Sequence, residues 1–261
     1  MEGRRSRWAG FIVWAGLGAA AIAIVIAWVV VLAGRSPAGR ETAAAQGPSG
    51  AAASPAPGIA SGRASLVAVA RVPLVHLYQT PSLAASPSVF QGRSALGVPA
   101  VFLVKQDDGA WLDVYVARRP DGSTTWIRSS EVTLQKDDYK VLVSLSLHRL
   151  TAMSGSRILL RTPVATGTAA TPTPVGTYFI TELLRQPDPS GAYGPYAYGL
   201  SAFSNVLSSF GGGPGQIGLH GTDEPALIGT AASNGCIRVP NAVVERLAGE
   251  LPLGTPVVIT R

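Results

Sequence analysis

The sequence predicts a mainly β protein that begins with a long apolar segment. From residue 65 onward, short runs of β-branched and aromatic residues alternate with Gly, Pro and Asp turns, and only one convincing helical run appears, near the C-terminus. A hydrophobic fraction of 47% in 261 residues provides enough apolar surface for a buried core. We therefore expect one or two β-rich domains after the N-terminal segment.

The apolar segment, residues 8–33, has the properties of a membrane anchor. It contains no charged side chain, and a helix that spans a bilayer needs about 20 apolar residues. Because Arg4, Arg5 and Arg7 precede it, the positive-inside rule places the start of the chain in the cytoplasm and the remainder outside. We expect residues 1–35 to form a cytoplasmic tail and a single-pass transmembrane helix in the cell membrane. A cleaved signal peptide is the alternative, although its apolar region usually spans only about 7 to 15 residues.

Residues 36–64 are predicted to form a flexible linker. They are rich in Ala, Gly, Pro and Ser and contain few large apolar side chains. Ordering such a segment would bury too little surface to offset the loss of chain entropy. We expect it to tether the folded part of the protein to the membrane.

The composition argues against two classes of protein. The formal net charge of +6 includes the arginines around the apolar segment, and no run of Lys or Arg with interleaved aromatic residues follows. Nucleic-acid binding is therefore not expected. The chain has one cysteine, so an intramolecular disulfide framework is excluded.

Residues 65–135 are predicted to form a small β domain. The candidate strands lie at residues 67–72, 100–104, 111–116 and 125–127, with turns at residues 107–109 and 120–122. The stretch 125–132, in which Trp126 precedes an apolar residue, resembles the last strands of bacterial SH3-like domains. This resemblance implies a small β-barrel that holds cell-wall peptide or packs on the next domain.

Residues 138–261 are predicted to form a second β-rich domain. Alternating apolar residues predict a hairpin of strands 141–147 and 157–164, and further strands are expected at residues 178–180 and 257–259. The stretch 186–216 is rich in Gly, Pro and Tyr, which indicates a long functional loop. A helix is expected over residues 242–248, with Asn241 as its N-cap.

The residues with the clearest chemical meaning are Cys236 and His220. A thiol attacks carbonyls as the thiolate, and a neighbouring imidazole can take its proton and later return it to a leaving amine. We therefore predict Cys236 as nucleophile and His220 as general base and acid. Gly235 lacks a Cβ, and its backbone N–H, together with that of Cys236, is expected to form an oxyanion hole. Only one histidine lies near this point, so a metal site is not predicted.

The residues around this pair resemble the L,D-transpeptidase catalytic domain family. The resemblance rests on linked blocks in the correct order: His220-Gly221-Thr222, Ser233-Asn234-Gly235-Cys236-Ile237-Arg238-Val239, an upstream Thr173-Pro174-Val175-Gly176-Thr177, and a terminal Gly254-Thr255-Pro256-Val257. It covers residues 138–261 and implies a β-sandwich with one short helix after the cysteine. The order of histidine before cysteine also disfavours papain-like peptidases.

The resemblance implies an enzyme of cell wall biogenesis, a cysteine acyltransferase that acts on peptidoglycan stem peptides. Cys236 would attack the carbonyl of the third residue of a tetrapeptide stem, release D-Ala and form a thioester. An amine of a neighbouring stem would resolve the thioester into a 3→3 cross-link, or water would hydrolyse it; the sequence leaves both open. We expect a monomer without cofactors, which the predicted membrane anchor places facing the cell wall. The resemblance further implies acylation by carbapenem-type β-lactams.

The resemblance also assigns roles around the reacting pair. The backbone carbonyl of Gly221 would orient His220, and Arg238 would bind a substrate carboxylate or brace the loop. Further substrate-binding residues are predicted from the same loops: Ser233, Asn234, Thr222 and Tyr198. Tyr193, Tyr196 and Tyr198 either line a substrate groove or pin the 186–216 loop.

Two other functions compete with this prediction. Sortases also use His, Cys and Arg in that order, but they place the cysteine much further from the histidine. A cell-wall-binding protein with an inactive catalytic domain is the other alternative. Its only support in the sequence is Asn234, because many relatives carry a histidine at that position.

Overall fold

The computed structural model of the protein describes residues 64–261. The expected transmembrane anchor (residues 1–35) and nearly all of the expected linker lie outside this range, so both stay predictions. Within residues 64–261, no helix combines the length and the apolar character needed to cross a membrane.

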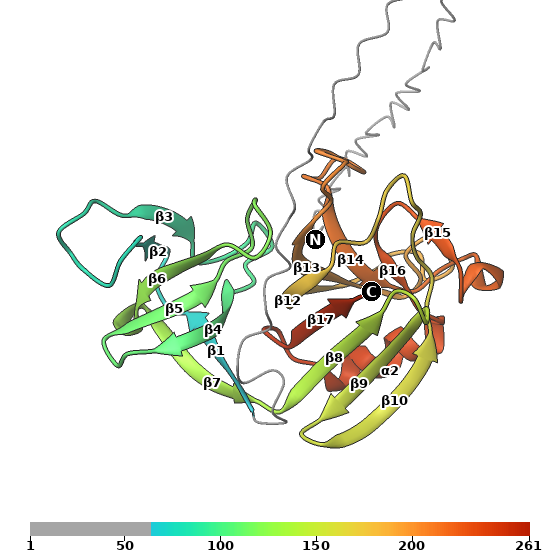
Figure 1. Cartoon of the computed structure of the whole chain (residues 1–261), viewed down its shortest axis with the longest axis horizontal. Helices are drawn as coiled ribbons and strands as arrows, with labels where there is room; N and C mark the ends of the chain where they lie inside the picture. Colours follow the sequence, from blue (N-terminus) through green and yellow to red (C-terminus); the bar gives the residue numbers. More distant parts are fainter. Residues whose placement is uncertain (1–63) are drawn as a thin grey trace, which may run out of the picture. The chain divides into compact units, whose positions relative to one another are not determined.

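The first sheet is antiparallel and is built from residues 65–137, here called the N-terminal β region. Its strands follow the order β6-β5-β4-β1-β7 (Figure 1). They are β1 (Ser65–Ala70), β4 (Val101–Asp107), β5 (Trp111–Tyr115), β6 (Thr124–Arg128) and β7 (Val132–Asp137), with a 3-10 turn at Ser129–Glu131. A separate hairpin consists of β2 (Leu74–Leu77) and β3 (Ser88–Gln91). The strands predicted at residues 67–72, 100–104, 111–116 and 125–127 are present with slightly different ends, whereas the SH3-like assignment stays a prediction.

The second sheet is mixed and has eight strands in the order β10-β9-β8-β17-β12-β13-β14-β16 (Figure 1). The β8–β17 and β14–β16 pairs are parallel, and the others are antiparallel. The strands are β8 (Tyr139–Ser144), β9 (Arg149–Ser154), β10 (Arg157–Pro163), β12 (Gly176–Arg185), β13 (Tyr196–Phe203), β14 (Gln216–His220), β16 (Ile237–Arg238) and β17 (Pro256–Thr260). Two short strands, β11 (Thr166–Gly167) and β15 (Ala231–Ser233), pair separately in parallel.

One short α-helix, α2 (Asn241–Glu250), lies between β16 and β17 in the chain, and a 3-10 turn lies at Pro225–Leu227. Val244 and Leu247 of α2 are completely buried and join the core of the large sheet. The prediction of a mainly β fold with one short helix after Cys236 is confirmed. The predicted N-cap is wrong: Pro240 holds that position and the cap has no side-chain hydrogen bond.

Two further predictions in this sheet are wrong. The expected hairpin of residues 141–147 and 157–164 is a three-stranded meander, because β9 lies between β8 and β10. The expected loop at residues 186–216 contains β13, one of the central strands. The inward-facing residues of β13 are Tyr198, Leu200 and Ala202, each at most 1% exposed. Small residues between them hide this alternation in the sequence.

The N-terminal β region packs directly on the large sheet. Val67, Leu103 and Tyr115 form a buried cluster with Phe179 of β12. The opposite face of β1 contributes Ala68 and Ala70 to the core of its own region, so this strand is covered on both faces. Thr255 Oγ1 also donates a hydrogen bond to Asp137 Oδ2 at 2.7 Å. The two β regions therefore share a buried, hydrogen-bonded interface.

Candidate active site

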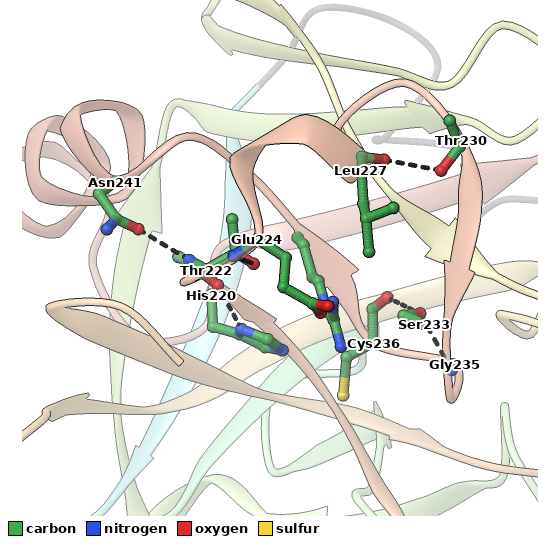
Figure 2. Close-up of polar contacts among 11 residues, drawn as sticks. His220, Thr222, Glu224, Leu227, Thr230, Ser233, Gly235, Cys236 and Asn241 are labelled. Carbon is green, nitrogen blue, oxygen red and sulfur yellow. Dashed lines mark hydrogen bonds and ion pairs between the residues drawn. The ribbon is translucent and has the colours of Figure 1, made fainter. Parts of the chain in front are cut away.

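Cys236 lies in a tight turn between β15 and β16. Hydrogen bonds from Ser233 and Thr173 hold this turn. The Ser233 hydroxyl donates to the Cys236 carbonyl and accepts from the Gly235 N–H at 3.1 Å (Figure 2). Thr173 Oγ1 donates to the Gly235 carbonyl at 2.8 Å. Gly235 has a φ of +115°, a conformation that an L-residue with a side chain rarely adopts. Glycine at this position is therefore a requirement of the turn that presents the thiol.

His220 ends β14 and is 4% exposed. Its Nδ1 lies 2.6 Å from the Gly221 carbonyl (Figure 2). Because a carbonyl only accepts hydrogen bonds, Nδ1 carries the proton and Nε2 is left as the basic nitrogen of the neutral ring. The next peptide is held by Asn241, whose Oδ1 accepts the Thr222 N–H at 2.7 Å. Asn241 therefore braces the backbone after the histidine instead of capping α2.

Gly218 brings the thiol and the imidazole to one place. Its N–H donates to Cys236 Sγ at 3.3 Å. A Cβ built on Gly218 would lie 3.5 Å from His220 Cδ2 and 3.7 Å from Cys236 Sγ. The parallel β14–β16 pairing, with Leu219 opposite Ile237, fixes this arrangement. The sequence reasoning missed Gly218, although a glycine two residues before the histidine, pointing to the same side of the strand, was a usable signal.

The electrostatics leave both reacting groups neutral at neutral pH. Burial lowers the pKa of His220 to about 4; the hydrogen bond to Gly221 and the charge of Asp223 oppose this, while the charge of Arg238 adds to it. Burial raises the pKa of the Cys236 thiol, and the Gly218 N–H and the charge of Arg238 reduce that effect. The free protein therefore holds a thiol beside a neutral base, not a preformed ion pair.

Arg238 is paired within the protein. Its Nη1 lies 2.7 Å from Glu224 Oε2, and the side chains are 17% and 55% exposed respectively. Within the described part of the chain, the buried Nε of Arg238 has no hydrogen-bond partner. A substrate carboxylate would have to replace that of Glu224 to bind this guanidinium.

The other predicted substrate-binding residues fall into three groups. Asn234 is exposed at the turn, as a contact residue requires. Ser233 and Thr222 are 2% and 3% exposed and serve the backbone, since Thr222 Oγ1 accepts the Glu224 N–H at 3.0 Å. Tyr198 is 1% exposed in the main core, so its assignment to a substrate surface is wrong.

Tyr193 is the aromatic residue that reaches the site. Its ring centroid lies 4.8 Å from that of His220, and the residue is 41% exposed. It therefore covers the imidazole from the loop between β12 and β13. Among residues 64–261, no group of His, Cys, Asp and Glu side chains is arranged to hold a metal ion.

Comparison with known proteins identifies the family. The family model for the L,D-transpeptidase catalytic domain (YkuD) matches residues 138–259. YqjB of Bacillus subtilis, whose name describes it as an L,D-transpeptidase, is 30% identical over 141 residues, which cover 50% of this chain and 75% of that protein. The chain belongs to the L,D-transpeptidase catalytic domain family.

Other relatives are similar over shorter shares or at lower identity. YkuD of Bacillus subtilis is 37% identical over 123 residues, which cover 47% of this chain and 66% of that protein. The match thus spans just under two thirds of that relative. An L,D-transpeptidase structure from Mycobacterium smegmatis is 15% identical, with a TM-score of 0.41, over 72% of this chain and 99% of that one.

Replacing Gly218 with alanine is expected to slow acylation of Cys236 by on the order of 10²-fold, because the methyl group would contact both His220 Cδ2 and Cys236 Sγ and crowd their approach to each other. Gly218 does not require a positive φ, but the new methyl group would lie 3.3 Å from the Tyr198 carbonyl oxygen, so we expect the free energy of unfolding to fall by about 1 kcal/mol. Stopped-flow acylation and denaturant unfolding measure the two effects. Gly249→Ala, in open space on α2, is the matched control and should react like the wild type. An unimpaired Gly218→Ala protein would contradict the proposed closeness of the two groups.

Proposed function

We propose that the protein is a peptidoglycan L,D-transpeptidase that uses Cys236 as nucleophile and His220 as general base and acid. The observation that carries the proposal is the placement of the thiol and the imidazole around the empty side of Gly218, within a chain of this family. The orientation of His220 by the Gly221 carbonyl supports the same roles.

In the proposed first half-reaction, the Sγ–H proton passes to Nε2 of His220 as the sulfur attacks the carbonyl carbon of the third residue of a tetrapeptide stem. The tetrahedral intermediate then collapses, the bond to the terminal D-Ala breaks, and His220 returns the proton to the amine of D-Ala. A thioester on Cys236 remains. Because the thiol is neutral in the free protein, proton transfer has to accompany the attack.

In the second half-reaction, an amine of a neighbouring stem or a water molecule attacks the thioester. His220 takes a proton from this nucleophile and gives it to the departing sulfur, so the enzyme is regenerated. The amine yields a 3→3 cross-link, and water yields a shortened stem. The same acyl-enzyme chemistry leads us to expect a stable adduct with carbapenems.

The oxyanion site requires an exchange of partners. Gly235 N–H, predicted as a donor, is already bound to the Ser233 hydroxyl in the free protein. We propose that the Cys236 N–H contacts the developing oxyanion first, and that Gly235 contributes only if the Ser233 hydroxyl turns away. Arg238 would bind a substrate carboxylate by a similar exchange with Glu224, whose half-exposed carboxylate water can solvate once it leaves the guanidinium.

The cellular setting is part of the proposal. We propose that residues 1–35 anchor the chain in the cell membrane and that residues 138–261 act as a monomer outside it, facing the cell wall. The charge pattern around residues 8–33 supports this orientation.

The full-length protein should be incubated with disaccharide-tetrapeptides and, separately, with a carbapenem, followed by mass spectrometry of products and intact protein. Release of D-Ala, dimer formation and one carbapenem adduct are expected. Iodoacetamide provides the control: the chain has one cysteine, so alkylation blocks Cys236 alone and should stop all three. Unchanged muropeptides and unmodified protein, with cell-wall binding retained, would instead support the inactive binding protein.

A further inference from the structure

The turn between β5 and β6 reaches across to a loop of the large sheet. Arg119 Nη1 donates to the Pro214 carbonyl at 2.8 Å, and its Nη2 donates to the carbonyls of Ser204 and Leu207 at 3.0 and 3.1 Å. The guanidinium carbon also lies 4.9 Å from the ring centroid of Phe203. One side chain of the N-terminal β region therefore holds both ends of residues 204–215, here called the β13–β14 loop.

Asp121, on the same turn, adds a second attachment. Both of its carboxylate oxygens accept the Phe203 N–H, at 3.0 and 3.1 Å. The Tyr178 hydroxyl of β12, which donates to the Val175 carbonyl at 3.2 Å, also lies close to this carboxylate. Hydrogen bonds to charged groups are about twice as strong as those between neutral groups. The Asp121 carboxylate thus binds the last residue of β13, and the Arg119 guanidinium binds the loop that follows.

The β13–β14 loop needs such anchors and leads directly into β14, the strand that carries His220. It contains Gly211, Gly212 and Gly215 at positive φ, which gives it high conformational freedom when it is not held. At its base, the Ser204 N–H donates to the Gly215 carbonyl at 2.8 Å, and β14 with His220 begins at the next residue.

The tip of the same loop lies near Tyr193, whose ring packs against His220. A Cβ on Gly211 would lie 3.8 Å from the Tyr193 hydroxyl, and the Tyr193 ring packs against His220. The tip of the loop therefore lies against Tyr193, which covers His220. The end of the loop leads into β14, the strand that carries His220.

We propose that Arg119 and Asp121 are positioning residues for the transpeptidase reaction: from the N-terminal β region, they hold the β13–β14 loop as a wall of the substrate site. This inference rests on the proposed function. It assigns the N-terminal β region a part in building the active site. The thiol and the imidazole stay in place without the loop, because the β14–β16 pairing and the Gly218 N–H hold them.

The test compares Arg119→Ala, Asp121→Asn and the wild type as full-length proteins. We expect Arg119→Ala to raise KM for a tetrapeptide stem by roughly 10-fold with kcat changed less than about 2-fold, because the wall is used in binding. Asp121→Asn keeps one acceptor oxygen and should show a smaller rise. Arg119→Lys should recover part of the loss, since one ammonium can still reach a carbonyl. Arg118→Ala, an exposed neighbour on the same turn, is the control and should match the wild type.

Two further measurements separate this inference from the proposed function. Hydrogen exchange of residues 204–215 should speed up in Arg119→Ala, whereas the rate of Cys236 alkylation by iodoacetamide should not change. Unaltered KM and unaltered exchange in Arg119→Ala would overturn the inference while leaving an active transpeptidase. If the wild type has no activity on stem peptides, the proposed function fails, and the exchange comparison still decides whether the turn holds the loop.

Discussion

Replacing Cys236 with alanine is expected to lower D-Ala release by roughly 10⁶-fold, to below detection, because the reaction loses its nucleophile. The chain offers no second thiol that could substitute. The fold should persist, since the change removes one sulfur atom and the hydrogen bond from the Gly218 N–H, a loss of about 1 kcal/mol. Intact-mass spectrometry after exposure to a carbapenem measures acylation, and denaturant unfolding measures stability.

A covalent adduct on the Cys236→Ala protein would show that another residue attacks and would end the proposed mechanism. Cys236→Ser is a useful companion variant because it preserves the shape of the turn. Its hydroxyl is a much poorer nucleophile than a thiol beside a base that titrates near 4. We expect at most a trace of acylation with it.

Replacing His220 with glutamine is expected to slow acylation by about 10²- to 10⁴-fold at pH 7, because the base that takes the thiol proton is lost. In the wild type, the rate should stay nearly constant as the pH falls from 7 to 5 and should drop as it approaches 4, where the imidazole becomes protonated. Rates of carbapenem acylation across this range test both statements. A wild-type profile that drops near pH 6.5 would mean that the histidine is not buried when it acts.

The same residue should make stability depend on pH. Its pKa is about 4 in the folded protein and 6.5 in the unfolded chain, so the unfolded chain binds the proton first as the pH falls. The free energy of unfolding should therefore decrease from pH 6.5 to pH 4, by roughly 3 kcal/mol in total. Denaturant unfolding of the wild type and His220→Gln at several pH values measures this difference. Equal pH slopes for the two proteins would refute the predicted burial effect.

The strands that the sequence predicted correctly are those with a strong local pattern of β-branched and aromatic residues. β1, β4, β5 and β17 are rich in β-branched and aromatic residues, and their sequences alone predicted them. β13 was missed because Gly199, two alanines and one serine weaken its alternation. A Cβ on Gly199 would approach side chains of Glu182 and Gln216 from neighbouring strands to within 3 Å. The reason for that glycine exists only once the sheet is assembled.

The residues of the site divide in the same way: some were predictable from the sequence, and others only from the folded structure. Cys236 and His220 were found from their chemistry and their neighbours, and the Gly221 carbonyl is adjacent to the ring that it contacts. Tyr198 was assigned to the substrate surface, but the register of β13 turns it into the core. Asn241 was assigned to a helix cap, but its amide reaches the chain after the histidine instead.

The groups that can react and the family that the chain resembles were predictable from the residues alone, because nucleophilicity, basicity and motif order belong to the residues themselves. Three contacts became visible only in the folded protein: Gly218 lies against both Sγ and the imidazole, Tyr193 covers the ring, and Arg119 holds a loop from another β region. These facts depend on strand register and on contacts between segments distant in the chain. A residue's type does not specify which face of a strand it occupies or what packs against it, so such contacts are settled only when the sheets form.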